Sequence, residues 1–160
     1  MVGDRAILGA TWVLGFTAKE KKLGSGFLTM TAEIRLKRKG GNMSVLIVFN
    51  REPYDGTDVT WNGLRLAENL RAKGAEVRIF LMNDSVDLAR DVCQPPPEYD
   101  QDLSGMLREL IAQGVAVKVC GTCMARCGVY KNHPYFEGAQ SSTMAELTQW
   151  VLDSDRVLTF

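Results

Sequence analysis

From residue 43 onward, short apolar runs alternate with longer stretches in which apolar residues recur every three or four positions. The runs of strand length cover residues 44–50, 75–82, 115–120 and 156–160. The first of them, over 44–50, is continuously apolar, and this indicates a strand that is covered on both faces of a sheet. Strands that alternate with helices are typical of βαβ units. We therefore predict an α/β, flavodoxin-like fold with three layers: a mainly parallel sheet of about five strands with helices on both faces.

The stretches between the runs carry helix signals. An apolar stripe at helical spacing begins at Trp61 and ends before Gly74, a residue type that commonly terminates helices. The predicted helix starts are Thr57 or Asp58, Asp102 or Ser104, and a capping box formed by Thr143 and Glu146. A shorter helix is expected over 85–91 and a helical turn over 122–127, while three consecutive prolines at 95–97 enforce an irregular loop.

Charge divides the chain at Met43. The whole chain carries 19 Lys and Arg against 19 Asp and Glu. Residues 1–42 hold eight basic against three acidic side chains, a net of +5, and residues 43–160 hold 11 against 16, a net of −5. We therefore expect a basic N-terminal extension over 1–42, either an upstream mis-start or a disordered segment, followed by one α/β domain over 43–160.

The composition also indicates which classes of partner and ligand the chain does not bind. The apolar run at 6–16 is only eleven residues long, whereas a helix that crosses a bilayer needs about 20. A neutral chain with an acidic domain gives no electrostatic argument for binding nucleic acid. We expect neither nucleic acid nor membrane as a partner. Glycine-rich nucleotide signatures are also absent from the sequence, and we expect no cofactor.

Three of the four cysteines crowd into one segment. Cys120, Cys123 and Cys127 fall within eight residues, whereas Cys93 stands alone before the prolines. A secreted scaffold spreads its cysteines to close loops, so this pattern indicates thiol chemistry in a reducing, cytoplasmic compartment. Cys120 ends a predicted strand, and free backbone amides at the start of a following helix favour a thiolate. We predict Cys120 as the nucleophile and Cys123 as an auxiliary or resolving thiol, with Gly121 giving a substrate sulfur close access to the backbone.

Other interpretations of these thiols stay open at the level of sequence. Cys120 and Cys123 have the spacing of a thioredoxin-type redox pair. The same pair with Cys127 and His133 has the composition of a Cys3His zinc site, although zinc ribbons usually present two separated Cys-x2-Cys pairs and His133 precedes a proline in an expected loop. Finally, free cysteines are often simply small buried side chains. If these cysteines pack or bind zinc, the chain is a non-catalytic oligomeric binding module.

The segment VAVKVCGTCMARCGV, preceded by MNDSVDLARDVCQPPPEYDQDLSGMLRELIAQGV, resembles the DsrE/DsrF-like family, and within it the YchN-like branch. The resemblance covers residues 43–160. In sulfur-relay members, a cysteine at the end of this strand and eight residues before a glycine carries sulfur as a persulfide, and Cys120 and Gly128 match that spacing. Members commonly show Arg-Gly at the end of the motif; here Cys127 replaces that arginine, and Arg126 is displaced by one position.

The resemblance implies a function as well as a fold. It implies a sulfur carrier of the sulfurtransferase type, which holds sulfane sulfur on Cys120 and passes it on. The implied partners are sulfur donor and acceptor proteins. The resemblance further implies a small α/β protein that forms a homotrimer or homohexamer.

Overall fold

The computed structural model describes residues 42–160, so the predicted extension lies, apart from Asn42, outside the described residues. The elements are β1 (Ser44–Phe49), α1 (Val59–Ala72), β2 (Glu76–Leu81), the 3-10 helix η1 (Asn83–Ala89), α2 (Leu103–Ala112), β3 (Ala116–Cys120), α3 (Gly121–Met124), β4 (Ala139–Ser142), α4 (Met144–Asp153) and β5 (Arg156–Thr159). None of the helices in this part of the chain combines the length and apolarity that crossing a membrane requires.

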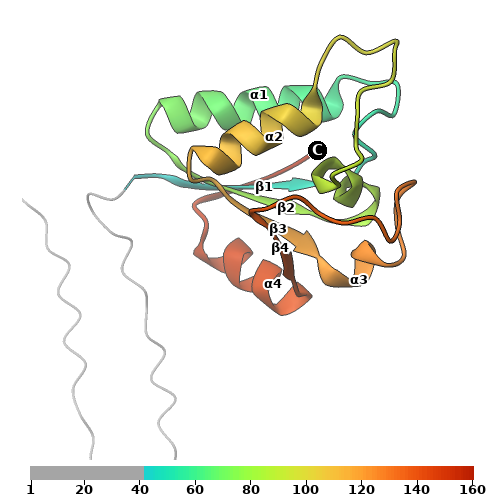
Figure 1. Cartoon of the computed structure of the whole chain (residues 1–160). Helices are drawn as coiled ribbons and strands as arrows, with labels where there is room; N and C mark the ends of the chain where they lie inside the picture. The colour runs from blue at the N-terminus through green and yellow to red at the C-terminus, as the bar shows by residue number, and fades with distance from the viewer. Residues whose placement is uncertain (1–41) are drawn as a thin grey trace, which may run out of the picture. The chain divides into compact units, whose positions relative to one another are not determined.

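The five strands form one parallel sheet in the order β4-β3-β2-β1-β5. Helices α1 and α2 cover one face of the sheet and α4 covers the other (Figure 1). This division follows from right-handed crossovers, because the chain moves from β1 through β2 and β3 to β4 in one direction and then returns past β1 to β5. The predicted three-layer α/β fold is confirmed.

The core explains why the sequence of β1 is a continuous apolar run. All six residues of β1 are buried, and Leu46, Ile47 and Phe49 have no exposed surface. In β2 the same holds for Ile79 and Phe80. Side chains on both faces of these central strands lie under helices, so neither face selects polar residues.

Strand β4 has no counterpart among the predicted runs. Its sequence, AQSS, is mostly polar, and two of its four residues are exposed because it lies at the lateral edge of the sheet. It pairs only with β3, where Val117 aligns with Ala139 and Cys120 with Ser142. An edge strand that buries little apolar surface leaves no hydrophobic pattern in the sequence.

The helix starts are partly as predicted. Asp102 caps α2 by accepting a hydrogen bond from the Gly105 amide at 2.8 Å. Asp58 occupies the N-cap position of α1 but makes no capping hydrogen bond through its side chain. The predicted capping box of α4 is half formed. Thr143 accepts from the Glu146 amide, whereas the Glu146 carboxylate accepts from Lys118 Nζ at 2.7 Å and from the Ser142 hydroxyl at 2.6 Å.

Candidate functional site

Cys120 is the last residue of β3, so it lies at the side of the sheet where the carboxyl ends of the parallel strands meet. Only 6% of it is exposed. Helix α3 begins at the next residue, as predicted, but it has four residues and ends at Met124, short of the predicted range 122–127. The sequence predicts that the start of this helix favours a thiolate at Cys120. Because α3 is only about one turn long, the backbone amides of a single turn provide that effect.

Gly121 has a different role from the one predicted. A Cβ atom at this position would lie 3.1 Å from both the Ser141 hydroxyl oxygen and the Ser142 carbonyl oxygen. The glycine therefore allows β4 to pack closely beside the start of α3. It does not open space for a substrate sulfur.

Cys123 lies directly beside Cys120. The two thiols share a hydrogen bond, and the Asn83 amide donates to Cys123 Sγ at 3.3 Å. Burial, followed by the hydrogen bond to Cys120, raises the pKa of Cys123 to about 11. At neutral pH Cys123 is therefore a protonated thiol that can donate to a Cys120 thiolate.

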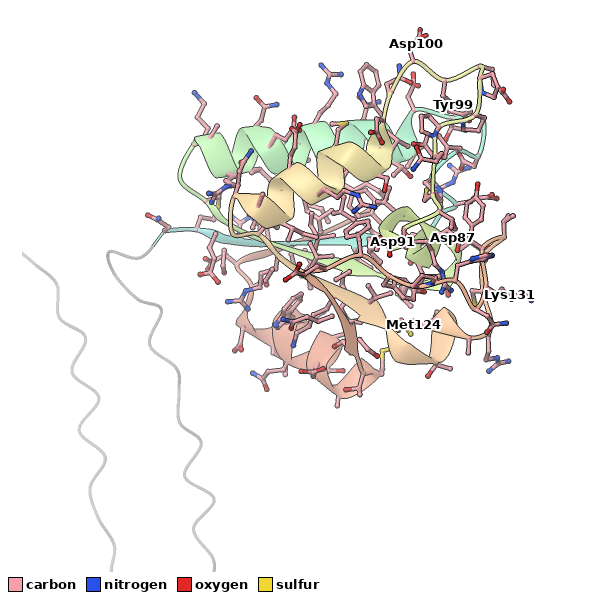
Figure 2. The ribbon with its side chains drawn as sticks, viewed as in Figure 1. Asp87, Asp91, Tyr99, Asp100, Met124 and Lys131 are labelled. Carbon is pink, nitrogen blue, oxygen red and sulfur yellow. The ribbon has the colours of Figure 1, made fainter. Side chains whose placement is uncertain are left out.

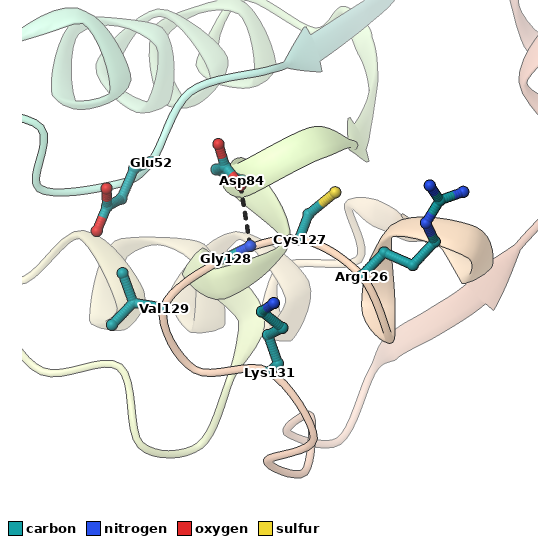
Figure 3. A pocket seen from close by; sticks show the side chains of 7 residues that line it. All are labelled: Glu52, Asp84, Arg126, Cys127, Gly128, Val129 and Lys131. Carbon is teal, nitrogen blue, oxygen red and sulfur yellow. Dashed lines mark hydrogen bonds between the residues drawn. The ribbon is translucent and has the colours of Figure 1, made fainter.

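Cys127 follows one turn later and is only half-buried. Its backbone amide donates to the Cys123 carbonyl at 2.8 Å. Unlike Cys120 and Cys123, it lines an open hollow of about 340 Å³ (Figure 3). The other lining residues are Glu52, Asp84, Arg126, Gly128, Val129 and Lys131.

The hollow is built from the ends of three neighbouring strands. Glu52 follows β1, Asp84 lies in η1 after β2, and the remaining lining residues follow β3. Asp84 also fixes the hollow's wall, because its carboxylate accepts from the Gly128 amide at 2.9 Å. Burial, and after it the nearby carboxylates Asp87 and Asp84, raise the pKa of Glu52. Ligands of parallel α/β sheets commonly bind at this edge.

A buried ion pair anchors the segment that carries Cys127. Asp87 and Arg90 have 0% and 1% of their side chains exposed, and their charged groups lie 3.4 Å apart. Asp87 accepts from the amides of Val129 and Tyr130. Arg90 donates to the carbonyls of Met124 and His133 and stacks on the Tyr135 ring. Figure 2 shows Asp87, Met124 and Lys131 at the same end of the molecule, beyond the strand ends.

Tyr135 lies near Cys120 and Cys123, which are called the inner thiols below. Its hydroxyl oxygen is buried and has no hydrogen-bond partner within residues 42–160. Burial raises the pKa of Tyr135 to about 12, and among the smaller causes are the nearby Cys123 and Cys120. The inner thiols therefore lie near a buried, protonated hydroxyl.

Cys93 is not part of this group. It is fully buried, and its electrostatic neighbours include Asp87, Asp102 and Arg108 but none of the other cysteines. Burial, with those two carboxylates, raises the pKa of Cys93 to about 12. Cys93 therefore behaves as a packed side chain.

The Cys3His arrangement considered from the sequence does not form. All four cysteines are free thiols, and within residues 42–160 no group of three or more His, Cys, Asp or Glu side chains is placed to hold a metal ion. His133 is exposed and takes part through its backbone, its amide donating to Tyr130 and its carbonyl accepting from Arg90.

The sequence analysis missed Glu52, Asp84 and the Asp87–Arg90 pair. No motif marks these residues. The available signal was positional, because Glu52 and Asp84 each come a few residues after a predicted buried strand. The carboxyl ends of parallel strands meet at one edge of the sheet, next to Cys120.

Comparison with known proteins identifies close relatives. Residues 43–160 match the DsrE/DsrF-like family. Protein YchN of Escherichia coli K12 is 39% identical over 118 residues, which are 72% of this chain and 97% of that protein. An uncharacterised protein of Methanopyrus kandleri is 35% identical over 116 residues, covering 72% and 93% of the two chains.

Solved structures agree with these matches. The crystal structure of the E. coli ychN protein superposes with a TM-score of 0.65 at 38% identity, over 74% of this chain and 99% of that one. A Bacteroides thetaiotaomicron protein of unknown function superposes with a TM-score of 0.53 at 19% identity, over 73% and 94% of the chains. At that identity the second likeness concerns the fold alone.

Proposed function

The chain belongs to the DsrE/DsrF-like family, and on that premise we propose that it is a sulfur carrier of the sulfurtransferase type. In this proposal Cys120 holds sulfane sulfur as a persulfide and passes it to a partner. Cys123 serves as the auxiliary thiol. Sulfur donor and acceptor proteins are the proposed partners.

One observation carries the proposal: Cys120 lies at the end of β3 with the Cys123 thiol hydrogen-bonded to it. A protonated neighbour that donates to a sulfur atom stabilises negative charge on that sulfur. Both the attacking thiolate and the terminal sulfur of a persulfide carry such charge. The buried Tyr135 hydroxyl provides a further polar group in the surroundings of these two thiols.

The transfer step needs no oxidant. The Cys120 thiolate attacks the outer sulfur of a donor persulfide, R–S–SH, and a new S–S bond forms at Cys120 while the donor S–S bond breaks. The electron pair leaves with the donor sulfur, which takes up a proton to become R–SH. Delivery repeats this exchange, with an acceptor thiolate attacking the outer sulfur on Cys120.

A thiol–disulfide or redox-sensing function is the second candidate. The contact between Cys120 and Cys123 favours it, because the two sulfurs already lie beside each other. Exchange with a partner's disulfide would join Cys120 and Cys123 in a disulfide, and the partner's disulfide would take up the two hydrogen atoms and leave as two thiols.

Mass spectrometry distinguishes the two candidates. We expect the protein, after incubation with a persulfide donor, to gain the mass of one sulfur atom on Cys120. The Cys120→Ser variant should show no sulfur at residue 120, whereas Cys93→Ala, which removes a buried thiol elsewhere, should load Cys120 like the wild type. Loss of two hydrogens across Cys120 and Cys123 without sulfur uptake would support the redox function and contradict the carrier.

A further inference from the structure

The carrier proposal leaves a question of access. Only 6% of Cys120 and 9% of Cys123 are exposed, so a donor sulfur has little room to reach either thiol directly. Cys127 is more exposed and is the only thiol among those lining the 340 Å³ hollow. A cavity of about 300 Å³ or more is large enough for a small molecule.

The three thiols are arranged in sequence from the hollow inward. Cys127 lies one helical turn after Cys123, with its amide on the Cys123 carbonyl at 2.8 Å, and Cys123 is hydrogen-bonded to Cys120. The wall of the hollow is also connected to Cys123. The Asn83 amide donates to Cys123 Sγ, and the next residue, Asp84, lines the hollow. A half-buried thiol that lines the hollow is thus connected through a second thiol to the buried strand end.

The charges in the hollow indicate what it binds. Glu52 lies across the hollow from Lys131 (Figure 3). Within residues 42–160 neither the Glu52 carboxylate nor the cations of Arg126 and Lys131 form an ion pair. Unpaired charges of both signs around one open space match a ligand that carries an ammonium and a carboxylate. The cations are on the strand-β3 side of the hollow, and the carboxylates follow β1 and β2.

We propose that Cys127 is the first sulfur acceptor of this chain and that the hollow binds a small zwitterionic persulfide of the amino-acid type. The ligand's ammonium lies toward Glu52 and Asp84, and its carboxylate toward Lys131 and Arg126. The sulfur then moves inward through Cys123 to Cys120. This inference rests on the carrier function proposed above.

Each step is a sulfur exchange without net oxidation. The Cys127 thiolate attacks the outer sulfur of the ligand persulfide, one S–S bond forms as another breaks, and the ligand leaves as a thiol after taking up a proton. Cys123 then attacks the outer sulfur on Cys127 while its proton passes to Cys120 along their hydrogen bond. Cys127 leaves as a thiolate. In the last exchange Cys120 gives up a proton to solvent and attacks the outer sulfur on Cys123, which leaves and is reprotonated.

A time course of sulfur loading tests the order of the thiols. The full chain is mixed with L-cysteine persulfide, alkylated at intervals and digested, and sulfur is located on each cysteine by mass spectrometry. In the wild type we expect sulfur on Cys127 before Cys120. In Cys120→Ser it should accumulate on Cys127 and Cys123. In Cys127→Ser and Cys127→Ala, loading of Cys120 should slow roughly tenfold or more, because the thiol that lines the hollow is missing.

Failure of this inference and failure of the carrier function give different results. If Cys120 loads at the wild-type rate in both Cys127 variants, Cys127 is not the first acceptor, while the carrier function stands. If sulfur reaches Cys127 in the wild type and never Cys120, the carrier function of Cys120 is wrong while Cys127 remains an acceptor. Thermal unfolding of each variant shows whether it is folded. If one of the two Cys127 variants does not fold, the other still tests the inference.

The class of ligand is tested with a second persulfide. Glu52→Gln should weaken loading of Cys127 by cysteine persulfide roughly tenfold, the size of one lost charge-assisted hydrogen bond. It should not change loading by the persulfide of 2-mercaptoethanol, which has neither the ammonium nor the carboxylate. Glu98→Gln, which removes an exposed carboxylate outside the hollow, is the matched control. Equal effects of Glu52→Gln on both persulfides, or no effect on either, would overturn the assignment of a zwitterionic ligand.

Discussion

Gly128 shows how a single residue shapes the candidate site. Its backbone adopts φ +85°, in the left-handed region that favours glycine. A Cβ atom at this position would overlap the Asp87 carboxylate, which accepts hydrogen bonds from the next two amides. The spacing of Cys120 and Gly128, seen in the sequence, therefore has a structural reason: the glycine lets the Cys127 segment close over Asp87.

We predict that Gly128→Ala lowers the free energy of unfolding by more than the cost of positive φ alone, which is about 1–2 kcal/mol. Gly114→Ala is the matched control, because Gly114 has φ +88° and its Cβ would meet no atom within 4 Å. Urea unfolding of the two variants measures the difference. Equal losses in both variants would show that contact with Asp87 contributes nothing.

Cys93 provides a prediction for the pH dependence of stability. Burial holds its pKa at about 12 in the folded protein, against an ordinary value of 9.0. The fold therefore favours the protonated thiol, and this contribution to stability is complete below pH 9 and is lost as the pH rises toward about 12. We expect the free energy of unfolding to fall over that range, and to fall less steeply in Cys93→Ala. Identical pH profiles for the two proteins would contradict the prediction.

At the residue scale, the sequence located the inner thiols but not the groups around them. Cys120 and Cys123 could be placed because a buried strand and a dense cysteine motif are local signals. Glu52 and Asp84 could not be placed from local signals. They come together at the hollow only because β1 and β2, about 30 residues apart along the chain, pair side by side. Gly121 was misinterpreted because its neighbour, β4, was itself unpredicted.

At the scale of elements, η1 holds the Cys127 segment in place. The sequence predicts a helix over 85–91, and the structure has the tighter 3-10 helix Asn83–Ala89 slightly earlier in the chain. This helix presents Asp87 to the amides of Val129 and Tyr130, while Arg90 at its end reaches the Met124 and His133 carbonyls. The sequence shows none of this, because charged residues spaced three apart usually indicate a solvated face.

We predict that Asp87→Ala lowers the free energy of unfolding by about 3–5 kcal/mol, because it leaves the Arg90 charge buried without its partner. Asp91→Ala is the control. Asp91 pairs with Arg108 at the same 3.4 Å, but both side chains are 45% exposed, so its loss should cost less than about 1 kcal/mol. Chemical denaturation measures both. Similar costs for the two variants would show that burial does not set the value of the Asp87–Arg90 pair.

At the largest scale, the domain described by residues 42–160 leaves apolar surface uncovered on one side of its sheet. Five strands spaced about 4.8 Å apart make a sheet wider than one helix of about 10 Å diameter can cover, and α4 is the only long helix on its face among the described residues (Figure 1). On this side, large apolar side chains of α4 and β5 are exposed. These side chains belong to Met144, Val151, Leu152 and Val157. Exposed apolar side chains gathered on neighbouring elements are typical of protein interfaces.

This surface supports the homotrimer or homohexamer that the family resemblance implies and gives a way to test it. Leu152 is 74% exposed, and we predict that Leu152→Glu reduces the mass of the particle in solution toward that of a monomer, because a buried carboxylate without a partner is costly in an interface. Asn69→Glu adds the same charge to an exposed position of α1 on the other face of the sheet, and it should keep the wild-type mass. Light scattering measures all three proteins. A monomeric wild type would contradict the oligomer, and an unchanged mass in Leu152→Glu would place the interface elsewhere on the molecule.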